Sequence, residues 1–337
     1  MTGAGSALRD GVRRVARAPV LLFGTFFTTL LIAIPLAIAL DGMLKAQLGT
    51  SGIATALARG ADEGWWQEFL AQAHGLGTTF VPSIIGFGAV LQDVSDLLDD
   101  VRMATTIAGV TAAWLVVWSF LSGGLLDRYA RNRAIRARGF FGACGAHFGP
   151  IVRLGLLALV AYGILFGWVH GWIAGEYGRL TRNLTVERSA FLVYGAALAV
   201  FGLLLIVVNV VVDYARIRIV VEDRRSAVGG LLAGFRFVRR QPGTVAALYG
   251  LNAALFIVLI AIYGLAAPGA GTAGAIVWLA FGLSEAYLLA RHFLKLTFYA
   301  SETALFQARL AHAAYTAAPP VLWPESPAAE SIGNTSP

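Results

Sequence analysis

The chain has 337 residues, of which 58% are hydrophobic and 13% are charged, and its mean hydropathy is +0.71. This composition excludes an ordinary soluble globular protein and is typical of a protein that crosses a membrane several times. The formal net charge of +7 comes from arginine, because only two of the 26 basic residues are lysines. In a membrane protein such an excess belongs to cytoplasmic loops, so we do not expect nucleic-acid binding.

The first apolar run follows a basic N-terminus. Residues 1–18 are polar and basic, and residues 19–40 are almost continuously apolar, which is long enough to cross about 30 Å of hydrocarbon. A signal peptide begins in a similar way, but its apolar core is usually shorter than this run. We therefore expect an uncleaved first transmembrane helix, preceded by a cytoplasmic N-terminal segment.

The longest connection, residues 42–102, differs in charge from the other loops. It carries seven acidic and three basic residues, a balance that fits the outer side of the membrane. Its apolar run 80–91 is too short to cross a bilayer. We expect an interfacial or re-entrant helix in this outer segment.

The remaining apolar runs predict five more transmembrane helices. They lie at about 104–126, 151–174, 190–212, 244–266 and 274–295. With the N-terminus inside, the cytoplasmic segments hold 16 basic residues and the outer segments hold 6, so both termini are expected in the cytoplasm. The predicted fold is all-α: one polytopic bundle of six transmembrane helices over residues 19–315, followed by a disordered tail, 316–337. The arginine bias, with abundant alanine and glycine, favours a bacterial origin and hence the cytoplasmic (inner) membrane.

Two cytoplasmic loops, 127–149 and 213–242, carry half of the arginines. Within the second loop, Ser226 is expected to cap an amphipathic helix, 227–240, that lies at the membrane interface. Its apolar residues recur at helical spacing: Val228, Leu231, Leu232, Phe235 and Val238. The candidate docking residues are Arg216, Arg218, Arg236, Arg239 and Arg240. They would bind anionic lipid headgroups or a cytoplasmic or membrane protein; an ordinary positive-inside loop is the alternative.

Two further patterns concern how the helices pack. Residues 129–133 (YARNR) resemble residues 214–218 (YARIR), and residues 292–295 offer a weaker third copy, which indicates repeated hairpin units. Gly163, Gly167, Gly171 and Gly175 form a stripe along the third span. Such a stripe lets another helix approach closely, within the chain or from a second copy.

Glu285 lies near the middle of the sixth expected span. A carboxylate at that depth is unfavourable, so it is a candidate functional group by default. His292 lies on the same helix face, and together they could begin a proton or cation path. The alternative is a neutral, structural glutamate, with Asn252 or Arg153 as its partner.

The sequence contains no motif for a known catalytic site, nucleotide cofactor or metal centre. There is no phosphate-binding G-x-x-x-x-G-K-[ST], no H-E-x-x-H and no G-x-S-x-G. Cys144 is the single cysteine, which excludes an intrachain disulfide, and its glycine-rich surroundings suggest a small filler on a loop. We predict no catalytic, cofactor or metal residue and therefore no enzyme activity.

Asp213-Tyr214-Ala215-Arg216, followed by the basic segment that ends at Pro242, resembles a pattern in bacterial polytopic membrane proteins. These proteins are broadly similar to the membrane domain attached to some glycerophosphodiester phosphodiesterases. The resemblance covers roughly spans four to six and implies a helical bundle. It carries over no catalytic residue, because the chain has no soluble phosphodiesterase domain.

Two functions follow from these patterns. The first is a non-enzymatic membrane scaffold or accessory subunit with a basic cytoplasmic docking face. The second is a transporter or permease subunit that uses Glu285. The sequence indicates neither a substrate nor an oligomeric state.

Overall fold

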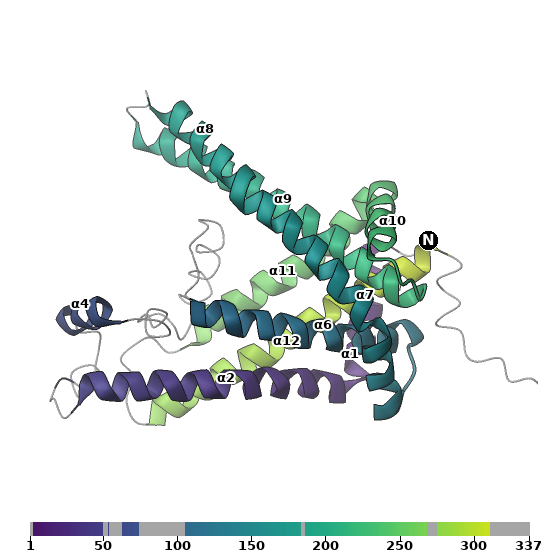
Figure 1. Cartoon of the computed structure of the whole chain (residues 1–337), viewed down its shortest axis with the longest axis horizontal. Helices are drawn as coiled ribbons and strands as arrows, with labels where there is room; N and C mark the ends of the chain where they lie inside the picture. The colour runs from purple at the N-terminus through teal and green to yellow at the C-terminus, as the bar shows by residue number, and fades with distance from the viewer. Residues whose placement is uncertain are drawn as a thin grey trace, which may run out of the picture.

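The computed structural model describes residues 3–49, 53, 63–73, 105–182, 186–267 and 275–310. Every regular element in these ranges is a helix (Figure 1). The expected outer helix at 80–91 and the expected tail at 316–337 lie outside the described residues.

The helices fall into short and long groups. The short ones are α1 (Ala4–Ala16), α4 (Glu63–Gln72), α8 (Gly171–Thr181) and α10 (Ala227–Arg240). The long ones are α2 (Pro19–Leu48), α6 (Thr105–Arg131), α7 (Ala137–Ile164), α9 (Glu187–Val221), α11 (Pro242–Ala266) and α12 (Ala275–Arg309). A six-residue π-helix, η2 (Leu165–His170), joins α7 to α8 without a break.

Five helical segments are long and apolar enough to cross a membrane. They are Pro19–Leu48, Gly109–Arg131, Ala137–Thr181, Glu187–Val221 and Pro242–Ala266. By length and composition they suit a multi-pass helical membrane protein, and they overlap five of the six expected spans. The sixth expected span lies in α12, which is helical as predicted but is not among the five apolar segments.

The first arginine-rich loop is mostly helical, which corrects the prediction of a loop over 127–149. Helix α6 continues to Arg131, and α7 begins at Ala137 and passes through Pro150. Cys144 is therefore in a helix and not on a loop. Its thiol is fully buried against α6, where a Cβ atom on Gly124 would lie 2.5 Å from its Sγ. Cys144 still acts as a small filler, since it packs where two helices cross closely.

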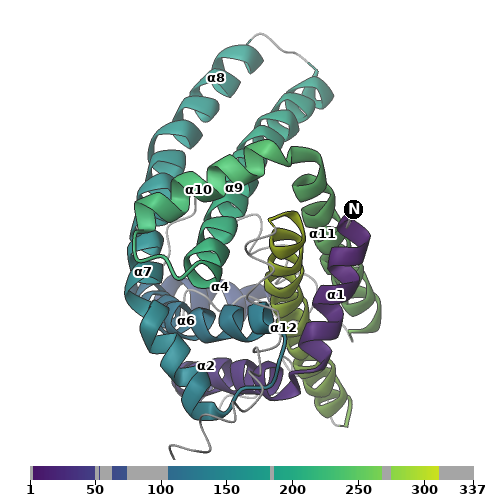
Figure 2. The ribbon, with the colours of Figure 1, turned by 90° about the vertical axis from the view of Figure 1, so that its right-hand side faces the viewer.

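The basic N-terminus is part of the bundle. Helix α1 packs along the C-terminal part of α12, and Ala7 and Val15 join the main hydrophobic core (Figure 2). Arg14 is only 6% exposed, and its Nη1 donates to the backbone oxygen of Tyr129 at 2.7 Å and to Gln307 Oε1 at 2.9 Å. The chain start is thus anchored to α6 and α12 together.

Three Tyr-Ala pairs mark an internal repeat. They are Tyr129-Ala130 in α6, Tyr214-Ala215 in α9 and Tyr299-Ala300 in α12, and successive copies are 85 residues apart. All six residues are buried, at 6% exposure or less. The third copy is therefore at 299–300 and not at 292–295, because the shared element is the buried Tyr-Ala pair rather than the basic extension.

Each Tyr-Ala helix has a second helix packed against it: α7 on α6, α10 on α9, and α1 on α12. In the first two units the second helix follows in the sequence, whereas in the third it comes from the N-terminus. Segments 11–19 and 234–242 share the pattern G-x-R-x-V-x-R-x-P, and both end at the proline that begins the next span. The bundle is therefore a ring of three similar units, closed by α1 (Figure 2).

The shared glycines are the points of closest approach. A Cβ atom on Gly11 would lie 2.7 Å from Ser301 N, and one on Gly234 would lie 2.7 Å from Ala215 N. No side chain fits at either position, so both pairs of helices require glycine there.

The predicted glycine stripe of the third span does not pack within the chain. A Cβ atom at Gly163, Gly167, Gly171 or Gly175 would meet no described atom within 4 Å. The π-helix between Leu165 and His170 also changes the helical phase within the stripe. The prediction that an intrachain helix packs on this face is therefore not confirmed.

We expect Gly11→Leu to destabilise the folded protein, because the new side chain would collide with the α12 backbone at Ser301. Overpacking of this kind lowers the free energy of unfolding by about 1–3 kcal/mol. Gly5→Leu in the same helix is the control, since Gly5 has no atom within 4 Å of its Cβ position. Thermal unfolding of the two detergent-purified variants measures the difference, and equal midpoints would contradict a close α1–α12 contact.

Candidate functional site

Polar side chains from five helices meet where α6, α9 and α12 converge. We call this cluster the polar hub. Its members are Trp118 (α6), Tyr162 (α7), Asn209, Asp213 and Arg216 (α9), Tyr249 (α11), and Tyr299 and Glu302 (α12). Two of the three Tyr-Ala helices supply its charged groups, and the third supplies Trp118.

The hydroxyl group of Tyr299 is the centre of the polar hub. It accepts a hydrogen bond from Trp118 Nε1 at 2.9 Å and another from Arg216 Nη1 at 2.8 Å. The same Arg216 nitrogen donates to Asp213 Oδ1 at 2.9 Å. One phenol oxygen therefore joins α6, α9 and α12, the central helices of the three units.

Asn209 extends the polar hub towards α7 and α11. Its Nδ2 donates to Asp213 Oδ2 at 3.2 Å and to the Tyr249 hydroxyl at 3.0 Å. Its Oδ1 accepts from the Tyr162 hydroxyl at 3.4 Å. Both oxygens of Asp213 are thus hydrogen-bonded, as a buried carboxylate requires.

Glu302 differs from Asp213 because neither of its carboxyl oxygens has a hydrogen-bond partner among the described residues. Glu302 is 1% exposed and lies beyond the expected sixth span. Burial raises the pKa of Glu302 well above its usual range, and the negative charge of Asp213 raises it further, while Arg216 lowers it. We therefore expect Glu302 to keep its proton at neutral pH.

The α12 side of the polar hub is buried, whereas Tyr162, Asn209, Arg216 and Tyr249 are half-buried. Residues 301–307 are all buried, although four of them are polar: Ser301, Glu302, Thr303 and Gln307. Such an arrangement can hold helices in register and can take up or release a proton at Glu302. Among the described residues, no group of three or more His, Cys, Asp or Glu side chains is placed to hold a metal ion.

The predicted intramembrane set is not brought together around Glu285. Glu285 is half-buried, and its Oε2 has no hydrogen-bond partner among the described residues. Asn252 donates to Ser301 Oγ at 3.1 Å, and Arg153 is exposed on α7. The expectation that Asn252 or Arg153 pairs with Glu285 is therefore wrong for the described residues.

His292 joins α12 to α2. One ring nitrogen lies 2.9 Å from Thr29 Oγ1, and the other lies 2.8 Å from the backbone oxygen of Leu288. Its ring also packs edge-on against Phe26. Both nitrogens are engaged, so the contacts of His292 are those of a packing residue.

The predicted docking arginines divide into two groups. The Arg216 guanidinium lies in the polar hub, and Arg218 pairs with Glu222 at 2.8 Å and donates to the backbone oxygen of Ala233. These two hold α9 and α10 in place and are not free to dock. The other three, Arg236, Arg239 and Arg240, are exposed on α10.

Sequence reasoning missed Tyr299 and Glu302. Glu302 lies in residues 301–307 (SETALFQ), and Tyr299 lies just before them. From sequence this segment is typical of a polar extension after the last apolar run. The constant 85-residue spacing of the Tyr-Ala pairs was the signal that could have found them, because it aligns Tyr299 with two tyrosines at the ends of apolar runs.

Comparison with protein families, curated proteins and solved structures finds no match to this chain. The resemblance to membrane domains of glycerophosphodiester phosphodiesterases therefore stays a prediction. Functional inference rests on the geometry of the described residues.

We expect the folding stability of wild type to fall as pH rises and that of Glu302→Gln not to fall with it. The folded state holds the Glu302 proton more tightly than the unfolded chain does, so wild-type stability falls as pH rises from the unfolded pKa towards the raised folded pKa. The amide cannot ionise, so the variant should gain roughly 1–3 kcal/mol over wild type near neutral pH and little at pH 4.

Thermal unfolding in detergent across pH 4–8 measures this effect. Glu187→Gln, at an exposed glutamate that begins α9, is the matched control and should parallel wild type. A constant difference between Glu302→Gln and wild type over the whole range would mean that Glu302 is not held in its neutral form.

Proposed function

We propose that the protein is a non-enzymatic scaffold or accessory subunit of the bacterial cytoplasmic membrane, with six spans and both termini inside. The observation that carries the proposal is the exposed face of α10. This face combines apolar side chains with arginines, and it belongs to a helix that is fixed to the bundle by its opposite face.

Helix α10 has two distinct faces. Its small residues and one phenylalanine are buried against α9: Ala227, Gly230, Ala233, Gly234 and Phe237. Phe237 packs between Tyr214 and Phe306, with its ring centroid 4.8 and 5.1 Å from theirs and the rings tilted against each other. Val228, Leu232 and Phe235 point away from α9 and are 49–56% exposed. We call these three the α10 stripe.

The bilayer is the occupant that best fits the α10 stripe. Helix α10 ends at Arg240, and span α11 begins two residues later at Pro242, so the stripe lies at the edge of the membrane. Apolar side chains at this level gain free energy in the headgroup and acyl boundary, and each nearby arginine adds about 1 kcal/mol on an anionic leaflet. Arg239 continues the stripe and would extend its charge to the headgroups.

The hydrogen bonds of the polar hub support a fixed platform. The close approaches at Gly11 and Gly234 hold α1 to α12 and α10 to α9, and the Tyr299 hydrogen bonds hold α9 to α12. All of these contacts lie at the expected cytoplasmic end. A scaffold needs a surface whose shape does not change, and this end of the bundle provides one.

We expect a fluorophore at position 232 to report lipid contact of the α10 stripe. Leu232→Cys in a Cys144→Ala background is labelled with a polarity-sensitive dye and placed in nanodiscs with or without anionic lipid. Anionic lipid should shift the emission to the blue, and Arg236→Gln/Arg239→Gln/Arg240→Gln should reverse most of the shift.

The matched control removes three exposed arginines from α1 and its C-cap instead: Arg9→Gln/Arg13→Gln/Arg17→Gln. It changes the net charge equally and should leave the emission shift largely in place. A dye that stays in water in every lipid would overturn the bilayer assignment and leave the α10 stripe to an acidic protein partner.

A second candidate, a transporter or permease subunit, is favoured by one observation. Two carboxylic acids of α12, Glu285 and Glu302, have buried oxygens with no hydrogen-bond partner among the described residues. Unpaired acids at two depths of one helix could pass a proton along it.

For this candidate we expect Glu285→Gln to abolish proton flux into proteoliposomes, measured with a trapped pH-sensitive dye. The amide keeps the shape of the side chain but cannot carry a proton. The exposed Glu187→Gln variant is the control and should retain the flux of wild type. Equal flux through wild type, both variants and empty liposomes would remove the transporter hypothesis.

A further inference from the structure

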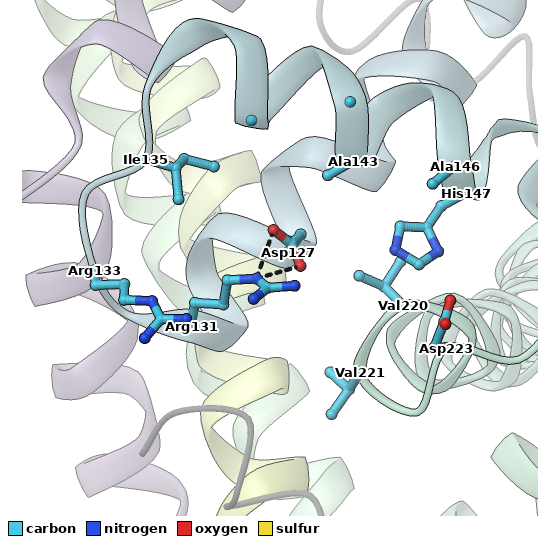
Figure 3. A pocket seen from close by; sticks show the side chains of 12 residues that line it. Asp127, Arg131, Arg133, Ile135, Ala143, Ala146, His147, Val220, Val221 and Asp223 are labelled. Carbon is cyan, nitrogen blue, oxygen red and sulfur yellow. Dashed lines mark hydrogen bonds and ion pairs between the residues drawn. The ribbon is translucent and has the colours of Figure 1, made fainter. Parts of the chain in front are cut away.

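A cavity of about 520 Å³ opens where the end of α6, the start of α7 and the end of α9 meet (Figure 3). Its floor is apolar and includes Ile135, Val220 and Val221. Glycines of α7, Gly139 and Gly142, also line the cavity, and Gly139 lies beside Ile135. The volume is in the range of small-ligand sites, and such sites combine apolar walls with a few polar groups.

The cavity has basic groups on one side and an acidic group on the other. Arg131 and Arg133 lie on one side, and His147 and Asp223 lie on the other (Figure 3). Asp127 lies beside Arg131 and is engaged by it. The cavity therefore offers cationic donors at one side and a carboxylate at the other.

Arg131 is positioned to bind an anion. Its Nε donates to both oxygens of Asp127, at 2.8 and 2.9 Å, which fixes the guanidinium plane. The two terminal nitrogens make no hydrogen bond with the described residues and can donate into the cavity. Arg133, which also lines the cavity, forms no ion pair among the described residues. Two such guanidinium groups match the oxygens of a phosphate.

The other side of the cavity holds an unpartnered buried side chain. His147 is 7% exposed, lines the cavity, and has no hydrogen bond with any described residue. Asp223 lies beside it at the exposed end of α9, where its backbone turns with φ at +48°. A carboxylate and an imidazole together can accept the protons of an ammonium group.

We propose that this cavity binds a zwitterion that carries a phosphate and a primary ammonium group, of the phosphoethanolamine type. The phosphate binds Arg131 and Arg133, and the ammonium binds Asp223 and His147. The same chemistry occurs in a phospholipid headgroup and in a free phosphorylated amine. The site is separate from the α10 stripe, and the proposal does not depend on the scaffold function.

The glycine wall provides a test that leaves the charges in place. Gly142→Leu fills the cavity, and its Cβ position has no atom within 4 Å, so the fold is not strained. Gly145→Leu is the matched control: Gly145 is in the same helix, is equally unhindered and does not line the cavity. Both variants should unfold at the wild-type temperature.

Binding is measured by calorimetry on the full-length protein in detergent, with phosphoethanolamine, glycerol phosphate and inorganic phosphate as probes. We expect phosphoethanolamine to bind at least tenfold more tightly than the other two. Gly142→Leu should abolish binding and Gly145→Leu should not. Arg133→Gln should weaken all three probes about tenfold, whereas Asp223→Asn should weaken only phosphoethanolamine.

A second experiment distinguishes a phospholipid headgroup from a free phosphorylated amine. Native mass spectrometry of the protein from nanodiscs should show retained phosphatidylethanolamine over phosphatidylglycerol if the ligand is a lipid, with loss in Gly142→Leu. Tight binding of free phosphoethanolamine without lipid retention would assign the soluble form. Three outcomes would overturn the proposal. Inorganic phosphate and phosphoethanolamine could bind equally well, no probe could bind in either experiment, or Gly142→Leu could bind as tightly as wild type.

Discussion

The hydrogen bonds of the Tyr299 hydroxyl are the interaction on which the rest of the structure depends. This oxygen accepts from Trp118 and Arg216 and so joins α6, α9 and α12 in the interior. Tyr299 lies beyond the expected sixth span, in the main hydrophobic core of the bundle. Buried polar contacts and the close approaches at Gly11 and Gly234 add to this core where the three helix pairs meet.

The internal repeat explains why the ends of the chain matter to the fold. In two units the packed helix follows its Tyr-Ala helix along the chain, but α12 receives α1 from the opposite end of the sequence. Arg14 of α1 then reaches both Tyr129 and Gln307. The N-terminus closes the ring, and this gives a basic, water-compatible segment a buried structural role.

The expected cytoplasmic end carries two different kinds of surface. The α10 stripe is apolar with adjacent arginines and faces outward, which suits a lipid interface. The cavity beside α7 holds paired opposite charges on an apolar floor, which suits a small zwitterion. Arg216 and Arg218 contribute to neither surface, because their guanidinium groups are bonded to Asp213 and Glu222. The arginines of the expected cytoplasmic segments therefore fall into three groups: those bonded inside the bundle, those beside the α10 stripe and those that line the cavity.

The sequence by itself determined the all-helical class and the positions of five long apolar helices, because a long apolar run that meets lipid must satisfy its backbone hydrogen bonds within itself. It also determined α10, through the Ser226 cap and the helical spacing of Val228, Leu231, Leu232, Phe235 and Val238, but it did not show that Leu231 and Val238 pack against the core. Only the tertiary structure placed Glu302 in the interior and showed that Glu285 and Asn252 do not meet. Such contacts lie between residues far apart in the chain, and the local pattern of SETALFQ is the same whether water or another helix covers it.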